Sequence, residues 1–126
     1  MFDGAIGLYK KAVELNPFYA AAHKNLGVAY LDAGLFQEAV THFSKAIELR
    51  LGDAETYFSL GLAFESLGRN DKSLEHYRKA LTLNPAAPLI EKIHFQFGTN
   101  LFEAEKFDEA LQHFRKTVES NPRSGR

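Results

Sequence analysis

The chain has 126 residues, 45% of them hydrophobic, and a formal net charge of −1. This length suits one ordered domain, and the balanced charge offers no basic field for nucleic acid or an anionic membrane surface. Cysteine is absent, which excludes disulfides, thiolate metal sites and cysteine nucleophiles. No apolar stretch approaches the ~20 residues of a membrane span, and the first residues do not resemble a signal peptide. We therefore expect a cytoplasmic protein.

Seven helices are predicted along the chain. In order, they cover about residues 2–15, 20–33, 36–49, 54–67, 70–83, 89–104 and 107–120. The first helix stands alone, and the other six form three pairs. Gly34 and Gly68 mark turns within pairs, whereas Pro17, Pro85 and Pro122 end the second helix of a unit. The short connections predict antiparallel helical hairpins.

A repeat of thirty-four residues relates these helices. The units are a half repeat at 1–19, full repeats at 20–53 and 54–87, and a third at 88–124 in which a three-residue insertion, Pro88 to Ile90, precedes the repeat pattern at 91–124; residues 125–126 form a tail. A fixed period of this length is typical of helical pairs that stack and bury a continuous core. We expect the insertion to extend or re-angle the first helix of the third hairpin.

Each full unit repeats the same small and large side chains. The first helices carry Leu26-Gly27 with Tyr30, Leu60-Gly61 with Phe64, and Phe97-Gly98 with Leu101. The second helices carry Ala39, Phe43 and Ala46; Ser73, Tyr77 and Ala80; and Ala110, Phe114 and Thr117. Glycine costs about 1 kcal/mol relative to alanine inside a helix. Its recurrence therefore needs a packing reason, and we expect the close approach of a neighbouring helix backbone.

This pattern resembles the tetratricopeptide repeat family over essentially the whole chain. The resemblance implies an all-α fold, a right-handed superhelical α-solenoid of antiparallel helical hairpins with three full units and a preceding half unit. Three positions depart from the pattern. Leu51 stands where a terminal proline is usual, Glu105 replaces the turn glycine, and Asn100 replaces the small residue seen as Ala29 and Ala63.

The face of the first helices opposite the core stripe lines a concave peptide groove in proteins that the chain resembles. The candidate groove residues here are Lys24, Val28, Leu31, Phe58, Leu62, Glu65, Lys92, Phe95, Thr99 and Phe102. The apolar members would contact an amphipathic helix or an extended segment, and Lys24, Glu65 and Lys92 would set its orientation. Alternatively, the aromatic members pack on neighbouring helices or on an inserted segment.

One subfamily, the chaperone-binding tetratricopeptide domains, grips a C-terminal carboxylate with a clamp of lysines, asparagines and an arginine. Lys24 and Lys92 fall at the lysine positions of that clamp, but Val28, Ser59 and Gln96 match none of the others. A clamp needs convergent donors to desolvate a carboxylate, and a valine supplies none. That specificity is not expected here.

Five histidines also recur with the repeat. His42, His76 and His113 precede the second-helix aromatic, while His23 and His94 stand where the middle unit has Tyr57. Metal ligands must converge within ~2–2.5 Å of an ion, whereas equivalent positions on successive hairpins lie ~8–10 Å apart. We therefore expect half-buried or solvated helix histidines, and no metal or cofactor. Phosphate-binding loops, nucleophile elbows and paired acid–base signatures are absent from the sequence, so catalysis is not expected.

Three functions remain open from the sequence. The first is a scaffold that binds a partner protein or peptide in the concave groove. The second is self-assembly into dimers or oligomers through uncapped ends. There Ile6, Tyr9 and Val13 lack a hairpin partner, and no following helix covers Leu111, Phe114 and Val118. The uncapped ends otherwise indicate an excerpt of a longer array, which is the interpretation that the amount of uncovered apolar surface favours. The third function is a regulatory or substrate-recruiting arm of a larger multidomain enzyme.

Overall fold

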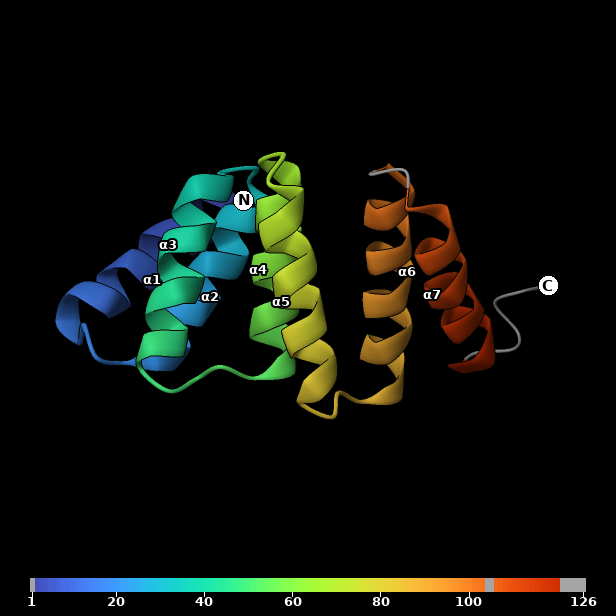
Figure 1. The fold of residues 1–126 in the computed structure, drawn as a ribbon. Coiled ribbons are helices and arrows are strands. Elements are labelled where there is room, and N and C mark those ends of the chain that lie inside the picture. Colours follow the sequence, from blue (N-terminus) through green and yellow to red (C-terminus); the bar gives the residue numbers. More distant parts are fainter. Residues whose placement is uncertain (1, 104–105, 121–126) are drawn as a thin grey trace.

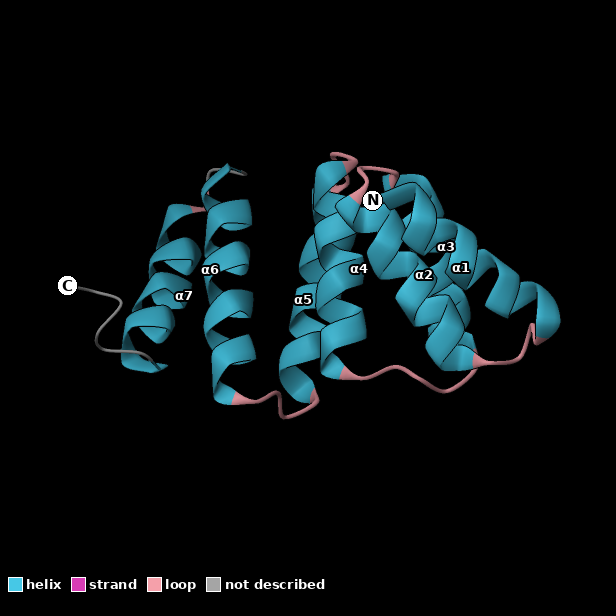
Figure 2. Ribbon diagram, turned by 180° about the vertical axis from the view of Figure 1, so that it is seen from behind, coloured by secondary structure: helices cyan, strands magenta, loops and turns pink. Residues whose placement is uncertain are grey.

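The computed structural model describes residues 2–103 and 106–120, and in these residues the chain is an all-α solenoid without strands. The helices are α1 (Phe2–Leu15), α2 (Ala20–Asp32), α3 (Phe36–Glu48), α4 (Ala54–Ser66), α5 (Asn70–Thr82), α6 (Ala87–Glu103) and α7 (Phe107–Ser120). Three antiparallel hairpins, α2–α3, α4–α5 and α6–α7, stand in a row with α1 at one end (Figures 1 and 2). The predicted α-solenoid is confirmed.

The helix ends follow from local backbone chemistry. Gly34 and Gly68 turn the chain within the first two hairpins with φ of 79° and 75°, as predicted. Helix α3, the second helix of the first hairpin, ends without a proline, because Arg50 adopts a left-handed conformation with φ of 74°. The amide of Leu51 then donates to the carbonyl of Ala46, 2.9 Å away, in the manner of a Schellman motif. Helices α2 to α5 each end one residue earlier than predicted.

The insertion before the third repeat lengthens its first helix. Helix α6 has 17 residues, against 13 in α2 and in α4, and it begins at Ala87, two residues before the predicted start. Pro88 lies in the first turn, where a helix needs no amide donor from that residue. The amides of Leu89 and Ile90 both donate to the carbonyl of Ala86. The predicted end at residue 104 and the turn at Glu105 lie outside the described residues.

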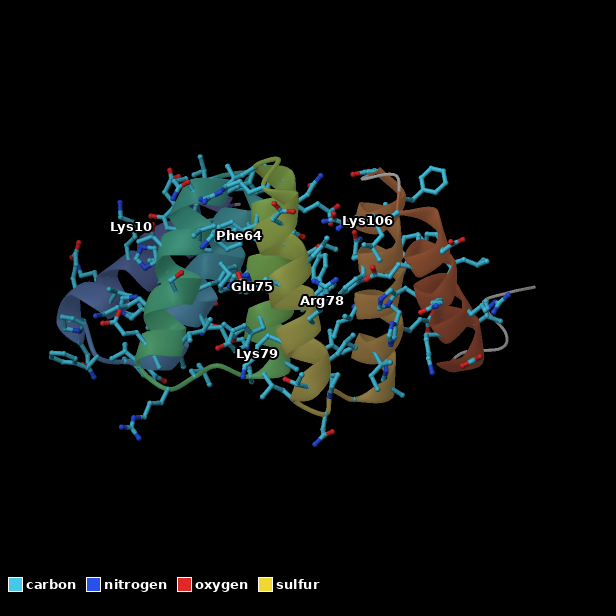
Figure 3. The ribbon with its side chains drawn as sticks, in the orientation of Figure 1. Lys10, Phe64, Glu75, Arg78, Lys79 and Lys106 are labelled. Carbon is cyan, nitrogen blue, oxygen red and sulfur yellow. The ribbon has the colours of Figure 1, made fainter. Side chains whose placement is uncertain are left out.

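Two adjoining apolar clusters hold the hairpins together. One lies between α2, α3 and α4 and includes Leu26, Phe43, Leu60 and Phe64; the other joins α4 to α7 and includes Tyr77, Ile93, Phe97 and Leu101. Each large buried side chain contributes about 1.5–3 kcal/mol through burial. Arg78 reaches from α5 toward α6 (Figure 3). There its guanidinium lies 5.1 Å from the Phe97 ring centre, and Nη2 lies 3.1 Å from Glu109 Oε2.

The repeated helix glycines make room for aromatic rings of the same hairpin. A Cβ on Gly27 would lie 2.8 Å from the ring of Phe43, and a Cβ on Gly61 would lie 2.5 Å from that of Tyr77. Gly98 stands in the same relation to Phe114, at 2.7 Å. The expectation that a neighbouring backbone requires these glycines was therefore wrong in its main point. The nearest atoms belong to the second-helix aromatic, which explains why both recur in every full unit.

Candidate functional site

A pocket of about 510 Å³ opens beside α4 and α6. Its lining residues are Phe58, Leu62, Glu91, Lys92, Phe95, Gln96 and Thr117. Four of the predicted groove residues, Phe58, Leu62, Lys92 and Phe95, therefore meet at one place. Concave, largely apolar surfaces with a few polar groups at the rim are the usual form of binding sites.

The two phenylalanines of the pocket differ in exposure. Phe58 is only 8% exposed, and its ring packs against that of Tyr77 with centres 5.7 Å apart. Phe95 is 52% exposed, and one side of its ring lies near Phe114, with centres 6.1 Å apart. Most of the Phe58 side chain is thus covered by neighbouring helices, as the alternative interpretation of these aromatics expected. Phe95 offers the larger free surface to a ligand.

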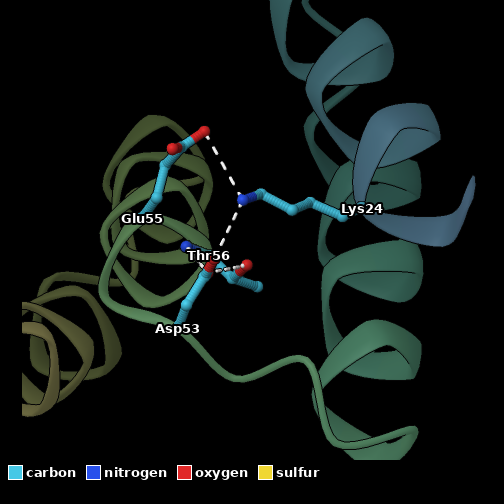
Figure 4. A network of polar contacts seen from close by, with 4 residues as sticks. All are labelled: Lys24, Asp53, Glu55 and Thr56. Carbon is cyan, nitrogen blue, oxygen red and sulfur yellow. Dashed lines mark hydrogen bonds and ion pairs between the residues drawn. The ribbon is translucent and has the colours of Figure 1, made fainter. Parts of the chain in front are cut away.

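Lys24 forms an ion-pair network between α2 and the start of α4 (Figure 4). Its Nζ lies 3.0 Å from Asp53 Oδ2 and 3.6 Å from Glu55 Oε1. Asp53 also caps α4 by accepting hydrogen bonds from the amide and hydroxyl of Thr56. Burial alone would raise the pKa of Asp53, but the hydrogen bonds from Thr56 and Lys24 lower it. The Lys24 ammonium is therefore engaged within the fold.

Glu65 belongs to a polar cluster inside the stack. The Tyr77 hydroxyl donates to Glu65 Oε1 at 2.8 Å, and Asn100 Nδ2 approaches the same oxygen at 3.4 Å. Asn100 Nδ2 also donates to Ser73 Oγ at 2.9 Å. Burial raises the pKa of Glu65 despite these donors. The Nδ2 group of the unusual Asn100 thus has partners on α4 and α5, whereas its buried Oδ1 has no hydrogen-bond partner among the described residues. Tyr77 and Asn100 occupy Glu65.

The remaining predicted groove residues have varied surroundings. Val28 and Leu31 are half-buried against the cluster around Phe43. The Thr99 hydroxyl donates to a carbonyl one turn earlier in α6. Lys92 and Phe102 are exposed. The structure therefore leaves Phe95 and Lys92 as the most accessible members beside the pocket.

A comparison with known proteins places this architecture. The profile of the tetratricopeptide repeat matches residues 18–86 and residues 54–122. The chain belongs to the tetratricopeptide repeat family. It is similar to a crystal structure of MamA, with a TM-score of 0.88 and 27% identity over 96% of this chain and 69% of that one. A further MamA structure gives 0.85 and 29% over 99% and 67%. For the structure of YrrB the values are 0.82 and 28% over 96% and 61%. No curated protein matches the chain by sequence.

Tetratricopeptide repeat proteins are generally non-catalytic interaction modules. Within residues 2–103 and 106–120, no group of three or more His, Cys, Asp or Glu side chains could hold a metal ion. Over the same residues, no helix has the length and apolar character needed to cross a membrane.

Two tetratricopeptide hairpins contain histidine pairs that sequence reasoning missed. His23 and His42 approach with their Nδ1 atoms 3.1 Å apart, and His94 and His113 approach to 2.7 Å. Both pairs join residues nineteen apart, across one hairpin. The spacing argument from the sequence applied to equivalent positions on successive hairpins, which are distant, and not to the two helices of one hairpin. The signal that could have revealed the pairs was the spacing of nineteen residues between the first-helix and second-helix histidines, which is the same in both units. In the middle unit Tyr57 replaces the first-helix histidine and faces His76.

Both terminal helices of the tetratricopeptide stack carry exposed apolar residues, which on α1 are Leu8 and Leu15. Ile6, Tyr9 and Val13, expected to lack a partner, are half-buried against the cluster around Phe43. On α7, Leu111 is 52% exposed, whereas the equivalent Leu74 on α5 is 3% exposed beneath α6. Leu111, Phe114 and Val118 line a shallow hollow together with Arg115 and Glu119. An apolar surface is therefore available on α7.

Proposed function

We propose that this chain is a non-catalytic interaction module that binds an apolar segment of a partner protein in the pocket beside α4 and α6. The observation that supports this most is the half-exposed Phe95 ring beside Leu62 and the rim of Phe58. When a ligand side chain covers an exposed aromatic ring in an apolar concavity, the removal of apolar surface from water favours binding. Lys92 and Glu91 stand at the same site and would contact polar groups flanking the apolar anchor.

Contacts within the fold occupy some of the charged groups expected to bind a ligand, which limits the classes of ligand that the groove can recognise. Lys24 is bound to Asp53 and Glu55, and Val28 offers no donor, so a carboxylate clamp is not the basis of recognition. Shape and apolar contact at Phe95 would dominate the affinity instead. YrrB, similar in fold, is described as a TPR protein with an unusual peptide-binding site. That description supports a peptide as the ligand class for this chain.

Selection from a display library of short random peptides tests the proposal. We expect the enriched peptides to carry a leucine or aromatic anchor and to bind the wild-type chain. Phe95→Glu should weaken their binding by roughly tenfold or more, which corresponds to about 1.4 kcal/mol. Phe18→Glu is the matched control, because Phe18 is a more exposed aromatic, at 76%, and does not line the pocket. Unchanged peptide affinity in a folded Phe95→Glu variant would show that the pocket is not the binding site.

Self-assembly is a second candidate, favoured by the exposed hollow on α7. In the first two hairpins, the corresponding face is covered by the first helix of the next unit. A second copy that covered Leu111 and Val118 would remove apolar surface from water in the same way. Sedimentation equilibrium over a range of concentrations tests this. A wild-type dimer that dissociates in Leu111→Lys would support it, and a monomer throughout would refute it.

A further inference from the structure

The His94–His113 pair joins the two helices of the third hairpin through a single shared proton. The Nδ1 atom of His94 on α6 lies 2.7 Å from Nδ1 of His113 on α7, with ring centres 4.9 Å apart. One ring must donate an N–H while the other accepts through a lone pair. If both Nδ1 atoms carry hydrogens, two donors face each other and the hydrogen bond is lost. The contact therefore requires at least one neutral imidazole.

The surroundings of this pair disfavour a second proton. The ring of His113 stacks on the buried Phe97, with centres 3.9 Å apart. Burial lowers the pKa of His113 to about 4; the positive charges on His94 and Arg78 act in the same direction, and Glu109 opposes them. Burial and Lys116 likewise lower the pKa of His94. The charged groups that face the pair are thus Arg78 from α5 and Glu109 and Lys116 from α7.

The pair is contiguous with the pocket. His94 immediately precedes Phe95, and His113 immediately precedes Phe114, whose ring lies 6.1 Å from that of Phe95. Thr117, one turn after His113 on α7, also lines the pocket. The histidine pair and the pocket therefore share the α6–α7 contact at which the Phe95 and Phe114 rings pack.

The middle hairpin provides an internal contrast. Tyr57 and His76 occupy the equivalent positions, with ring centres 6.0 Å apart. The Nδ1 atom of His76 lies 2.7 Å from the carbonyl oxygen of Lys72 on its own helix, so Nδ1–H donates to that oxygen. A proton added at Nε2 leaves this bond intact. The middle hairpin therefore has no contact between two imidazole nitrogens at this position.

We propose that the His94–His113 pair makes ligand binding in the pocket acid-sensitive. On acidification both imidazoles of the pair become protonated from solvent and their two Nδ1–H groups face each other. Helices α6 and α7 then separate at this point, Phe95 is displaced, and an apolar segment bound beside it is released. This inference rests on the proposed function of the pocket, and it adds a physical condition under which the pocket empties. The pair takes up a proton and not a metal ion, because among the described residues no third metal-binding side chain accompanies the two imidazoles.

The test compares His94→Tyr, which copies the middle hairpin, with His76→Gln as the matched control. The probe is a peptide from the display selection that contains no His, Asp or Glu. Between about pH 7.5 and about pH 3.5, a range that includes the lowered pKa of His113, wild-type and His76→Gln should lose affinity by roughly threefold or more as the competent fraction falls. His94→Tyr should lose little. If His94→Tyr is unfolded by circular dichroism, His94→Gln takes its place. An equal loss of affinity in the His94 variant and wild-type overturns the proposal.

A second readout needs no peptide and separates this proposal from the groove function. Side-chain NMR of the free wild-type chain follows the imidazole nitrogens of His113 and the ring protons of Phe95 during acid titration. Both should change with the same midpoint, and the Phe95 change should shrink in His94→Tyr. If no peptide binds at neutral pH, the proposed function fails while this coupling is still measured. Phe95 signals that stay constant while His113 titrates would overturn the proposal.

Discussion

Replacing Gly61 by alanine should destabilise the fold, although alanine is the better helix former. The new Cβ would lie 2.5 Å from Cε1 and 2.6 Å from Cδ1 of Tyr77, and 3.3 Å from the carbonyl oxygen of Ser73. Tyr77 is fully buried, and its hydroxyl donates to Glu65. The ring therefore has no free space into which it can retreat without loss of that hydrogen bond.

The expected magnitude follows from opposing effects. Overpacking costs about 1–3 kcal/mol, and a weakened hydrogen bond to a charged group costs up to about 1.5–3 kcal/mol. Helix propensity returns about 1 kcal/mol. The free energy of unfolding should thus fall by roughly 2 kcal/mol, within the usual range for core substitutions.

Urea denaturation followed by circular dichroism measures this change, with Gly7→Ala as the matched control. Gly7 lies inside α1, and nothing lies within 4 Å of its added Cβ. Gly7→Ala should stabilise the chain by about 0.5–1 kcal/mol. In a Tyr77→Ala background, Gly61→Ala should lose its penalty, because the ring that it meets is gone. If Gly61→Ala is as stable as wild-type, the ring does not explain why glycine recurs.

Three further predictions concern single groups. Arg50→Gly should stabilise the chain by about 1 kcal/mol, because Arg50 has φ of 74° and left-handed backbone is costly for residues with a Cβ; a lower thermal midpoint would contradict this. Lys24→Gln should lower the free energy of unfolding by less than about 1 kcal/mol, as for partly exposed ion pairs, and should leave peptide affinity unchanged. Weakened peptide binding in this variant would show that Lys24 contacts the ligand after all. Because burial lowers the pKa of His113 from 6.5 to about 4, the folded state binds fewer protons than the unfolded state between these values. Stability should be complete above about pH 6.5 and fall by about 1–2 kcal/mol, after solvent screening, as the pH drops to about 4, so a flat urea midpoint across this range would contradict the buried pair.

The features that sequence predicts well here are those set by neighbours in the chain. The hairpin turns at Gly34 and Gly68 depend on local backbone freedom, and both were found as expected. Helix α6 is longer than α4, with 17 residues against 13, and it contains the three inserted residues that led us to expect an extended or re-angled helix. Repetition adds confidence to such local signals, because one packing arrangement must satisfy every copy.

The features that sequence failed to predict depend on side chains from other helices. Glu65 carries a charge on the face predicted to line the groove, yet Tyr77 and Asn100 occupy it from α5 and α6. Phe58 is covered in the same way by a ring from α5. The histidine pairs cross a hairpin, and their contact depends on how two helices are set against each other. No periodic pattern along one helix encodes these contacts.

The most direct test of the central claim is to map the selected peptide onto the chain by amide NMR at neutral pH. The central proposal is that a partner segment binds in the apolar pocket beside α4 and α6. The largest shift changes should fall on Leu62, Lys92, Phe95 and Gln96. Changes confined to Leu111 and Val118 on α7, with these four residues unaffected, would contradict the claim and assign binding to the outer face of the stack.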